Sequence, residues 1–344
     1  MKVLFSSNIN PNFKTFSDYI EKAFREADCE TCFFENRAFV LPGRIRDRIA
    51  FLQDWDLSRL NKRLLEKAAE FKPQLYVEAG GWNILPDTIE KLKTMGIKTA
   101  LWTIDPPHTF EAIIKASPHY DFVFCQGTEA IEILKEYDVK NLHWLPFACD
   151  PDFHKSVELT PSERRKYGTE ICFVGSWNPE SNPQNYAKRH AALECLTDYD
   201  LGIWGPGWND LPVESNLKKF IRGFHTKPEE WVKIYSATQI AIIVHYMDTK
   251  GSVPCYQASP KVFEAIACGA LLVVDDQRDV LSLFESGRHL VVYHNHKELR
   301  EILSYYLEHP DEARKIAQQG RDTVIKKHTF RHRVDEMLRI IQKE

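Results

Sequence analysis

The sequence predicts an α/β protein made of two Rossmann-like halves, each built on a parallel sheet. The chain has 344 residues, which exceeds a typical single domain and suggests two domains of roughly 150 to 170 residues. Short apolar, β-rich runs alternate with amphipathic helical segments along most of the chain, and this alternation favours parallel sheets. One segment, residues 239–274, has the pattern of a strand, a loop, a helix and a second strand, which is a parallel βαβ unit.

The first half is predicted to span residues 1–150. It opens with an apolar strand at residues 1–7, followed by a helix over residues 16–27 with one apolar face. A second amphipathic helix covers residues 57–71. The rest of this half is predicted to contain strands at 74–79, 98–103, 121–125 and 142–145 and helices at 87–95 and 128–137. No G-x-G-x-x-G follows the first strand, which disfavours a hydride-transfer enzyme.

Residues 151–168 lack periodicity and contain two prolines and a charged run, so they are predicted to be an interdomain linker. The second domain is predicted to span residues 169–320. Its expected elements are strands at 170–175, 201–204, 239–245 and 270–274 and helices at 185–197, 228–236 and 259–269. The chain is expected to be helical from about residue 297, with residues 321–344 forming a C-terminal helix.

Composition and charge exclude several classes of partner. The 45 basic and 49 acidic residues leave a net charge of −4, and no basic patch interleaved with aromatic residues indicates nucleic-acid binding. No apolar run approaches the length of about 20 residues that a membrane span needs. The eight cysteines lie mostly in apolar runs, as is typical of reduced, buried thiols. We therefore expect a cytoplasmic protein without a membrane span.

The segment 259–269 carries the clearest functional signal. Ser259 suits a helix N-cap, Pro260 suits the first helical position, and Gly269 suits the position just past the helix end. The free amides at such a helix start attract phosphate, while the carboxylate of Glu264 can accept hydrogen bonds from hydroxyl groups. Phosphates beside vicinal hydroxyls describe a nucleotide. The alternative, that Glu264 is an ordinary solvated helix residue, stays open at this point.

Several segments together resemble a known family. They are residues 173–177, Arg189, residues 203–208, residues 259–269 and residues 328–333, with a weaker match at residues 102–108. Together they are similar to the CgeB-like spore-maturation group of glycosyltransferases, which have the GT-B fold. The resemblance implies two facing Rossmann-like domains with an interdomain cleft and a nucleotide-sugar donor held mainly by the second domain. It also implies a final helix that can cross back to the first domain.

The resemblance assigns roles to the start of helix 259–269. Glu264 matches the acid that binds the donor ribose hydroxyls in many GT-B enzymes, while Ser259, Pro260 and Lys261 open the helix that would face the diphosphate. Many retaining GT-B enzymes carry a second acid eight residues earlier, where this chain has Tyr256. The resemblance therefore does not specify which sugar this chain would transfer or whether transfer inverts or retains the anomeric configuration.

Further donor-binding candidates lie at predicted strand ends. Gly175 and Ser176 would let a phosphate or sugar approach the backbone, and Arg189 could balance the charge of the leaving diphosphate unless it is a solvated helix cation. His245 at a strand end could contact donor phosphate or sugar, although a satisfied core histidine is the commoner outcome. The last candidate is an aromatic turn that contains Trp204, Gly205 and Gly207. It suits contact with the base or ribose of the donor. The alternative is a core tryptophan followed by a turn.

Catalytic candidates follow the strand at 98–103. Asp105 and His108 can each accept a proton from an acceptor hydroxyl, although Asp105 before two prolines is equally typical of a turn. Glu78, before Gly80 and Gly81, is a weaker candidate for the acceptor side. An inverting transferase requires such a base, whereas a retaining one can lack it.

The sequence thus predicts a hexosyltransferase-type enzyme that uses a UDP-linked sugar donor and no other cofactor. Three Asp-x-Asp pairs occur, at 54/56, 150/152 and 198/200, but none follows a predicted strand as a metal-holding pair should, so we expect no essential metal. The acceptor, whether glycan, protein or small molecule, is not specified. Two alternatives stay open: a nucleotide-sugar epimerase or hydrolase with the same fold, and a non-catalytic nucleotide-binding protein.

Overall fold

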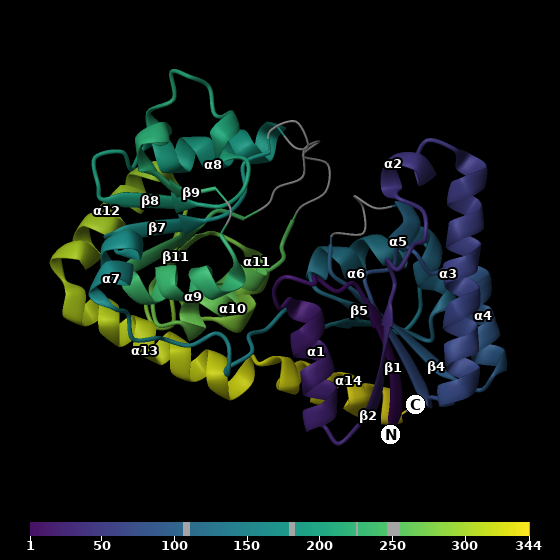
Figure 1. Ribbon diagram of the computed structural model, residues 1–344. Coiled ribbons are helices and arrows are strands. Elements are labelled where there is room, and N and C mark those ends of the chain that lie inside the picture. Colours follow the sequence, from purple (N-terminus) through teal and green to yellow (C-terminus); the bar gives the residue numbers. More distant parts are fainter. Residues whose placement is uncertain (106–110, 179–182, 225, 246–254, 344) are drawn as a thin grey trace. The chain divides into compact units, whose positions relative to one another are not determined.

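The computed structural model describes residues 1–105, 111–178, 183–224, 226–245 and 255–343, with side chains of 183–185 outside this description. The chain divides into two compact units, drawn together in Figure 1. Unit 1 comprises Met1–Pro146 and Phe330–Glu344, and unit 2 comprises Phe147–Thr329. Each unit contains a six-stranded sheet in which every recorded pair of neighbouring strands is parallel, so the predicted α/β class is confirmed.

Unit 1 has the strand order β2-β1-β3-β4-β5-β6. Its strands are β1 (Lys2–Ser7), β2 (Glu30–Glu35), β3 (Leu75–Ala79), β4 (Lys98–Thr103), β5 (Phe122–Cys125) and β6 (Leu142–Trp144). Its helices are α1 (Phe16–Glu26), α2 (Gly43–Arg46), α3 (Ala50–Phe71), α4 (Pro86–Thr94), α5 (Glu111–Ala116), α6 (Thr128–Lys135) and α14 (Phe330–Lys343). The chain moves outward in opposite directions from β1 and β3, so the topological switch point of this sheet lies between those two strands.

The last helix, α14, is part of unit 1, where it packs beside α1 (Figure 1). The ring of Phe330 lies 5.8 Å from that of Tyr19 on α1 and 6.4 Å from that of Trp102 on β4. Arg333 donates from Nε to the carbonyl of Pro146 at 2.8 Å, and both Phe330 and Arg333 are buried. This helix therefore completes the hydrophobic core of unit 1 although it ends the chain.

Unit 2 has the strand order β12-β11-β10-β7-β8-β9. Its strands are β7 (Ile171–Val174), β8 (Leu201–Trp204), β9 (Ile221–Gly223), β10 (Ile240–Ile243), β11 (Leu271–Asp275) and β12 (Val291–Tyr293). Its helices are α7 (Pro161–Tyr167), α8 (Pro183–Glu194), α9 (Pro228–Ala237), α10 (Pro260–Ala267), α11 (Arg278–Leu283), α12 (His296–Glu308) and α13 (Pro310–Lys327). The switch point lies between β7 and β10, where ligands of open α/β sheets bind beyond the carboxyl ends of the strands.

The segment predicted as a linker has a defined structure inside unit 2. Residues 161–167 form α7, which begins with a capping box in which Thr160 and Glu163 bond to each other's main-chain N–H groups. Earlier in the segment, His154 is buried with 4% exposure. The prediction failed because α7 buries only Tyr167 and so shows no apolar period. The units instead meet in sequence between Pro146 and Phe147.

The helical C-terminal region consists of three helices rather than one run. Pro310 begins α13, and the chain leaves the helical conformation again at His328 and Thr329 before α14. Unit 2 therefore extends to Thr329, past the predicted boundary at residue 320. The short edge strands β9 and β12, of three residues each, were not predicted.

Candidate functional site

The βαβ unit predicted from residues 239–274 is present as β10, α10 and the parallel strand β11. Ser259 occupies the N-cap position of α10 and Pro260 its first helical position, although the Ser259 hydroxyl makes no capping hydrogen bond. Gly269 has φ of 90° directly after the helix, as a left-handed C′ residue should. Ser259, Pro260 and Lys261 are half-buried, so the start of the helix is accessible to a ligand.

Glu264 lies one turn into α10 with its two carboxylate oxygens in different surroundings. Oε1 lies 3.9 Å from Nε2 of His154. The Nδ1 atom of that imidazole accepts the main-chain N–H of Asp150 at 3.0 Å, which leaves the ring hydrogen on Nε2 beside Glu264. Burial lowers the pKa of His154, which favours the neutral ring. Oε2 of Glu264 is buried and has no hydrogen-bond partner among the described residues, so it is available to a ligand hydroxyl.

Two cations converge near this carboxylate. Lys261 on α10 holds its Nζ 3.9 Å from the centre of the Trp231 ring. Burial lowers the pKa of Lys261, and the Arg189 guanidinium lowers it further while Glu264 opposes both effects. Arg189 on α8 stacks over the Tyr186 ring at 4.9 Å. Two close cations repel each other unless an anion joins them, so this arrangement suits a diphosphate.

The ends of β7 and β8 form a tight backbone crossing. Gly175 directly follows β7, and the N–H of this glycine donates to the carbonyl of Trp204 at 2.9 Å. The carbonyl of Ser176 accepts from Nη1 of Arg189 at 2.5 Å, which links this strand end to α8. Gly205 has φ of 141°, and a Cβ there would stand 2.1 Å from the carbonyl oxygen of Gly175. A pocket of about 480 Å³ opens here, lined by Ser176, Trp177, Asn178, Tyr186, Pro206, Gly207 and Asp210.

The prediction that Trp204 contacts the base or ribose is wrong for its ring. Trp204 is only 1% exposed. Its ring occupies the space beside Gly202 and Gly223, where an added Cβ would come within 2.3 and 3.0 Å of it. The alternative, a core tryptophan followed by a turn, describes this residue. Sequence alone did not separate the two because both begin with an aromatic residue at a strand end.

His245 follows the end of β10 and is 2% exposed. Its Nδ1 lies 2.6 Å from Oδ1 of Asp275, the last residue of β11, while its Nε2 has no partner among the described residues. The histidine is thus satisfied on one side only, so it is not the fully satisfied core histidine, and its contact with the donor stays a prediction.

The catalytic candidates belong to unit 1. Asp105 is half-buried just past β4; burial raises the pKa of Asp105, although Arg37 opposes the rise. His108 lies outside the described residues. Glu78 on β3 is fully buried, and its carboxyl accepts hydrogen bonds from the Tyr120 hydroxyl and, at 3.0 Å, from the N–H of Gly81. Glu78 therefore fixes the turn after β3 rather than meeting an acceptor.

We expect Glu78→Gln to remove a pH dependence of stability. Burial raises the pKa of Glu78 to about 7 despite its hydrogen bonds. The folded state therefore binds more protons than the unfolded state between about pH 4.3 and 7, and stability falls as pH rises through this window. The difference in free energy of unfolding, variant minus wild type, should therefore be on the order of 2–4 kcal/mol larger at pH 8 than at pH 4. Urea unfolding of both proteins at the two pH values tests this; a constant difference would contradict it.

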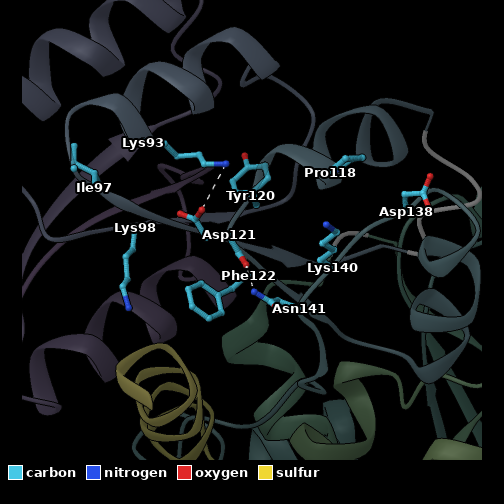
Figure 2. A pocket seen from close by; sticks show the side chains of 11 residues that line it. Lys93, Ile97, Lys98, Pro118, Tyr120, Asp121, Phe122, Asp138, Lys140 and Asn141 are labelled. Atoms are coloured by element: carbon cyan, nitrogen blue, oxygen red, sulfur yellow. Dashed lines mark hydrogen bonds and ion pairs between the residues drawn. The ribbon is translucent and has the colours of Figure 1, made fainter. Parts of the chain in front are cut away.

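A second pocket lies at the edge of the unit 1 sheet where the strands begin, opposite the edge that carries Asp105 (Figure 2). It surrounds the amino ends of β4 and β5, where Lys98 begins β4 and Asp121 precedes β5. Three of its charged groups are already bonded within unit 1: Lys93 lies 3.6 Å from Asp121, and Lys98 donates to the carbonyl of Ile341 at 2.9 Å. Because ligands of such sheets bind at the carboxyl edge, this pocket is not the candidate site.

Comparison with known proteins agrees with this geometry. The glycosyl transferase-like family matches residues 188–339, which include Arg189, Lys261 and Glu264. The spore protein CgeB of Bacillus subtilis (strain 168) is 20% identical over 275 residues, covering 77% of this chain and 82% of that protein. The chain is therefore similar to CgeB. The resemblance inferred from the sequence is therefore confirmed.

Solved structures show the GT-B fold of this chain over nearly its whole length. Sucrose-phosphate synthase from Thermosynechococcus elongatus superposes with a TM-score of 0.72 at 11% identity, covering 99% of this chain and 98% of that one. Anabaena Alr3699/HepE in complex with UDP-glucose gives a TM-score of 0.68 at 12% identity with both chains fully covered. At these identities the likeness establishes the two-domain α/β GT-B architecture.

Sequence reasoning missed three residues of the candidate site. His154 was hidden in the supposed linker, and Asp275 and Lys188 join His245 only through the tertiary fold. The one available signal was Asp275 itself, a charged residue closing an apolar strand. Within the described part of the chain, no group of three or more His, Cys, Asp or Glu side chains is arranged to hold a metal ion. Likewise, none of the described helices is long and apolar enough to cross a membrane.

Proposed function

We propose that this CgeB-like protein transfers a sugar, of the hexose type, from a nucleotide-diphosphate donor to an acceptor hydroxyl. The observation that carries the proposal is the group around α10. There, a Glu264 oxygen without a partner among the described residues, two convergent cations and the start of a helix lie together in unit 2. Glu264 would bind the ribose hydroxyls, and Lys261 and Arg189 would bind the diphosphate and stabilise it as the leaving group.

The donor is proposed to be UDP-linked. Support comes from Anabaena Alr3699/HepE, which shares the fold and was solved in complex with UDP-glucose. The paired cations supply positive charge that a divalent ion provides in other transferases, so transfer is proposed to be metal-independent. Gly175, Ser176, Gly205 and Gly207 would border the donor through backbone and small side chains.

Asp105 is proposed as the base that accepts the proton of the acceptor hydroxyl. Its raised pKa brings the carboxyl closer to the working range of a general base. His108 is the second candidate for this role. Glycan, protein and small-molecule acceptors each supply the hydroxyl that this chemistry needs.

Product analysis tests the proposal. Wild-type protein is incubated with UDP-sugars and a panel of hydroxyl acceptors, and the anomeric protons are followed by NMR. We expect a new glycoside to appear with UDP, and Asp105→Asn to bind UDP normally while transferring about 100-fold more slowly. A fully active variant would exclude Asp105 as the base. Donor turnover without a glycoside would favour the hydrolase or epimerase, and binding without any turnover would favour the non-catalytic protein.

A further inference from the structure

One side of His245 is tied down by hydrogen bonds to a single carboxylate. Nδ1 lies 2.6 Å from Oδ1 of Asp275, and the main-chain N–H of His245 donates to the same oxygen at 3.0 Å and to Oδ2 at 3.2 Å. Asp275 closes β11, the strand paired with β10. Because a carboxylate only accepts, the imidazole hydrogen must sit on Nδ1.

A third residue holds the carboxylate. Lys188 on α8 places its Nζ 2.5 Å from Oδ2 of Asp275. Burial alone would raise the pKa of Asp275, but His245 and Lys188 together hold it well below its usual range. Asp275 is therefore an anion with both oxygens engaged, and it fixes the orientation of the His245 ring.

The other ring nitrogen has nothing to bind within the described part of the chain. Nε2 of His245 is buried without a hydrogen-bond partner, although buried polar atoms are normally paired. Because Nδ1 of the same ring is held by Asp275, the unpartnered Nε2 of His245 indicates a binding site for a ligand.

The position of His245 indicates which ligand is missing. In the register of β10 and β7, Ile242 lies opposite Phe173. His245 and Ser176 each follow these paired residues by three positions, so both stand past the carboxyl ends of their strands. This is the switch point of unit 2, where anionic ligands of such sheets bind. Arg189, next to Lys188 on α8, reaches the same strand end by donating to the Ser176 carbonyl.

We propose that Asp275 and Lys188 are positioning residues that present Nε2 of His245 to the diphosphate of the donor. The inference rests on the proposed function and deepens it. With Nδ1–H held by Asp275, the imidazolium form of the ring presents Nε2–H to a phosphate oxygen, which accepts this hydrogen bond.

Two matched substitutions separate this role from a structural one. The amide of His245→Asn takes the place of Nδ1 and can keep the contact to Asp275 but offers nothing at Nε2, whereas His245→Gln carries its amide near the place of Nε2. We expect His245→Asn to bind UDP about 10-fold more weakly and His245→Gln to lose less, measured by calorimetry. Uridine, measured by competition, should bind both variants as it binds wild type. Equal UDP affinity of the two variants, or an equal loss for uridine, would overturn the proposal.

A double-mutant cycle tests Asp275. We expect Asp275→Asn to weaken UDP binding in wild type but to have little further effect in His245→Asn, because it acts through Nε2. Full additivity would contradict a positioning role.

A measurement on the wild-type protein tests the same proposal even if the variants fail to fold. In protein labelled with ¹⁵N-histidine, saturating UDP should shift the Nε2 resonance of His245 more than its Nδ1 resonance. An unmoved Nε2 resonance in a protein that binds UDP overturns this inference alone. A wild-type protein that binds no nucleotide diphosphate would instead overturn the proposed function.

Discussion

Glu264→Ala is expected to weaken UDP binding by about 10- to 100-fold, the loss typical of hydrogen bonds to a charged group. Glu264 has one oxygen beside His154 and one buried oxygen with no partner among the described residues. Removing the carboxylate removes the acceptor for the ribose hydroxyls. It also removes the carboxylate that favours the charged form of Lys261 beside Arg189, which should reduce the thermal stability of the nucleotide-free protein slightly.

Two controls accompany this substitution. Glu264→Gln keeps the shape and one carbonyl acceptor, so its UDP affinity should lie between those of wild type and Glu264→Ala. Glu301→Ala removes an exposed acid of α12 that pairs only with Lys297 among the described residues, and it should bind UDP as wild type does. Isothermal titration calorimetry with UDP measures all three. Wild-type affinity in Glu264→Ala would remove the main support for the donor site.

Gly207→Ala is expected to destabilise unit 2 strongly. Gly207 has φ of 84°, and a Cβ there would stand 1.8 Å from the carbonyl oxygen of Trp177. That oxygen belongs to the backbone and cannot rotate away. An alanine in the left-handed conformation lowers the free energy of unfolding by about 1–2 kcal/mol, and the clash should lower it by about 1–3 kcal/mol more. The turn also lines the pocket beside Ser176, so UDP affinity should fall as well.

Gly287→Ala is the matched control for this clash. Gly287 has nearly the same φ, 78°, but no atom lies within 4 Å of the Cβ that would be added. It should show the cost of the left-handed conformation alone, a loss of roughly 2–8 °C in Tm for a unit of this size. Thermal unfolding of both variants separates the two effects. Equal Tm values would show that the turn at Gly207 moves freely, contrary to the packing described.

Local patterns explain which parts of the molecule could be predicted. The helix start at Ser259 and Pro260, its end at Gly269 and the apolar strands on either side are recognisable because each depends on residues close in sequence. For the same reason the parallel sheets and most helices could be predicted. The resemblance then matched Glu264 to the ribose-binding acid of many GT-B enzymes, and the structure leaves one oxygen of Glu264 unpartnered among the described residues.

The residues that were missed depend on contacts distant in sequence. Asp275 meets His245 thirty residues away, and His154 meets Glu264 from a segment without periodicity. No local pattern records such pairs. Trp204 illustrates the opposite error, since an aromatic residue at a strand end fits both a binding surface and a core, and only its 1% exposure decides.

The most direct test of the central claim is nucleotide binding by the wild-type protein in the presence of EDTA. Thermal unfolding is recorded with UDP, GDP, TDP, their common sugar conjugates and NAD. A nucleotide at about one hundred times its Kd stabilises the folded state by about 2.7 kcal/mol, which is several degrees in Tm. We predict such a shift with UDP and UDP-sugars and none with NAD. No shift with any nucleotide diphosphate, or a shift that EDTA abolishes, would contradict the metal-independent donor site proposed around Glu264.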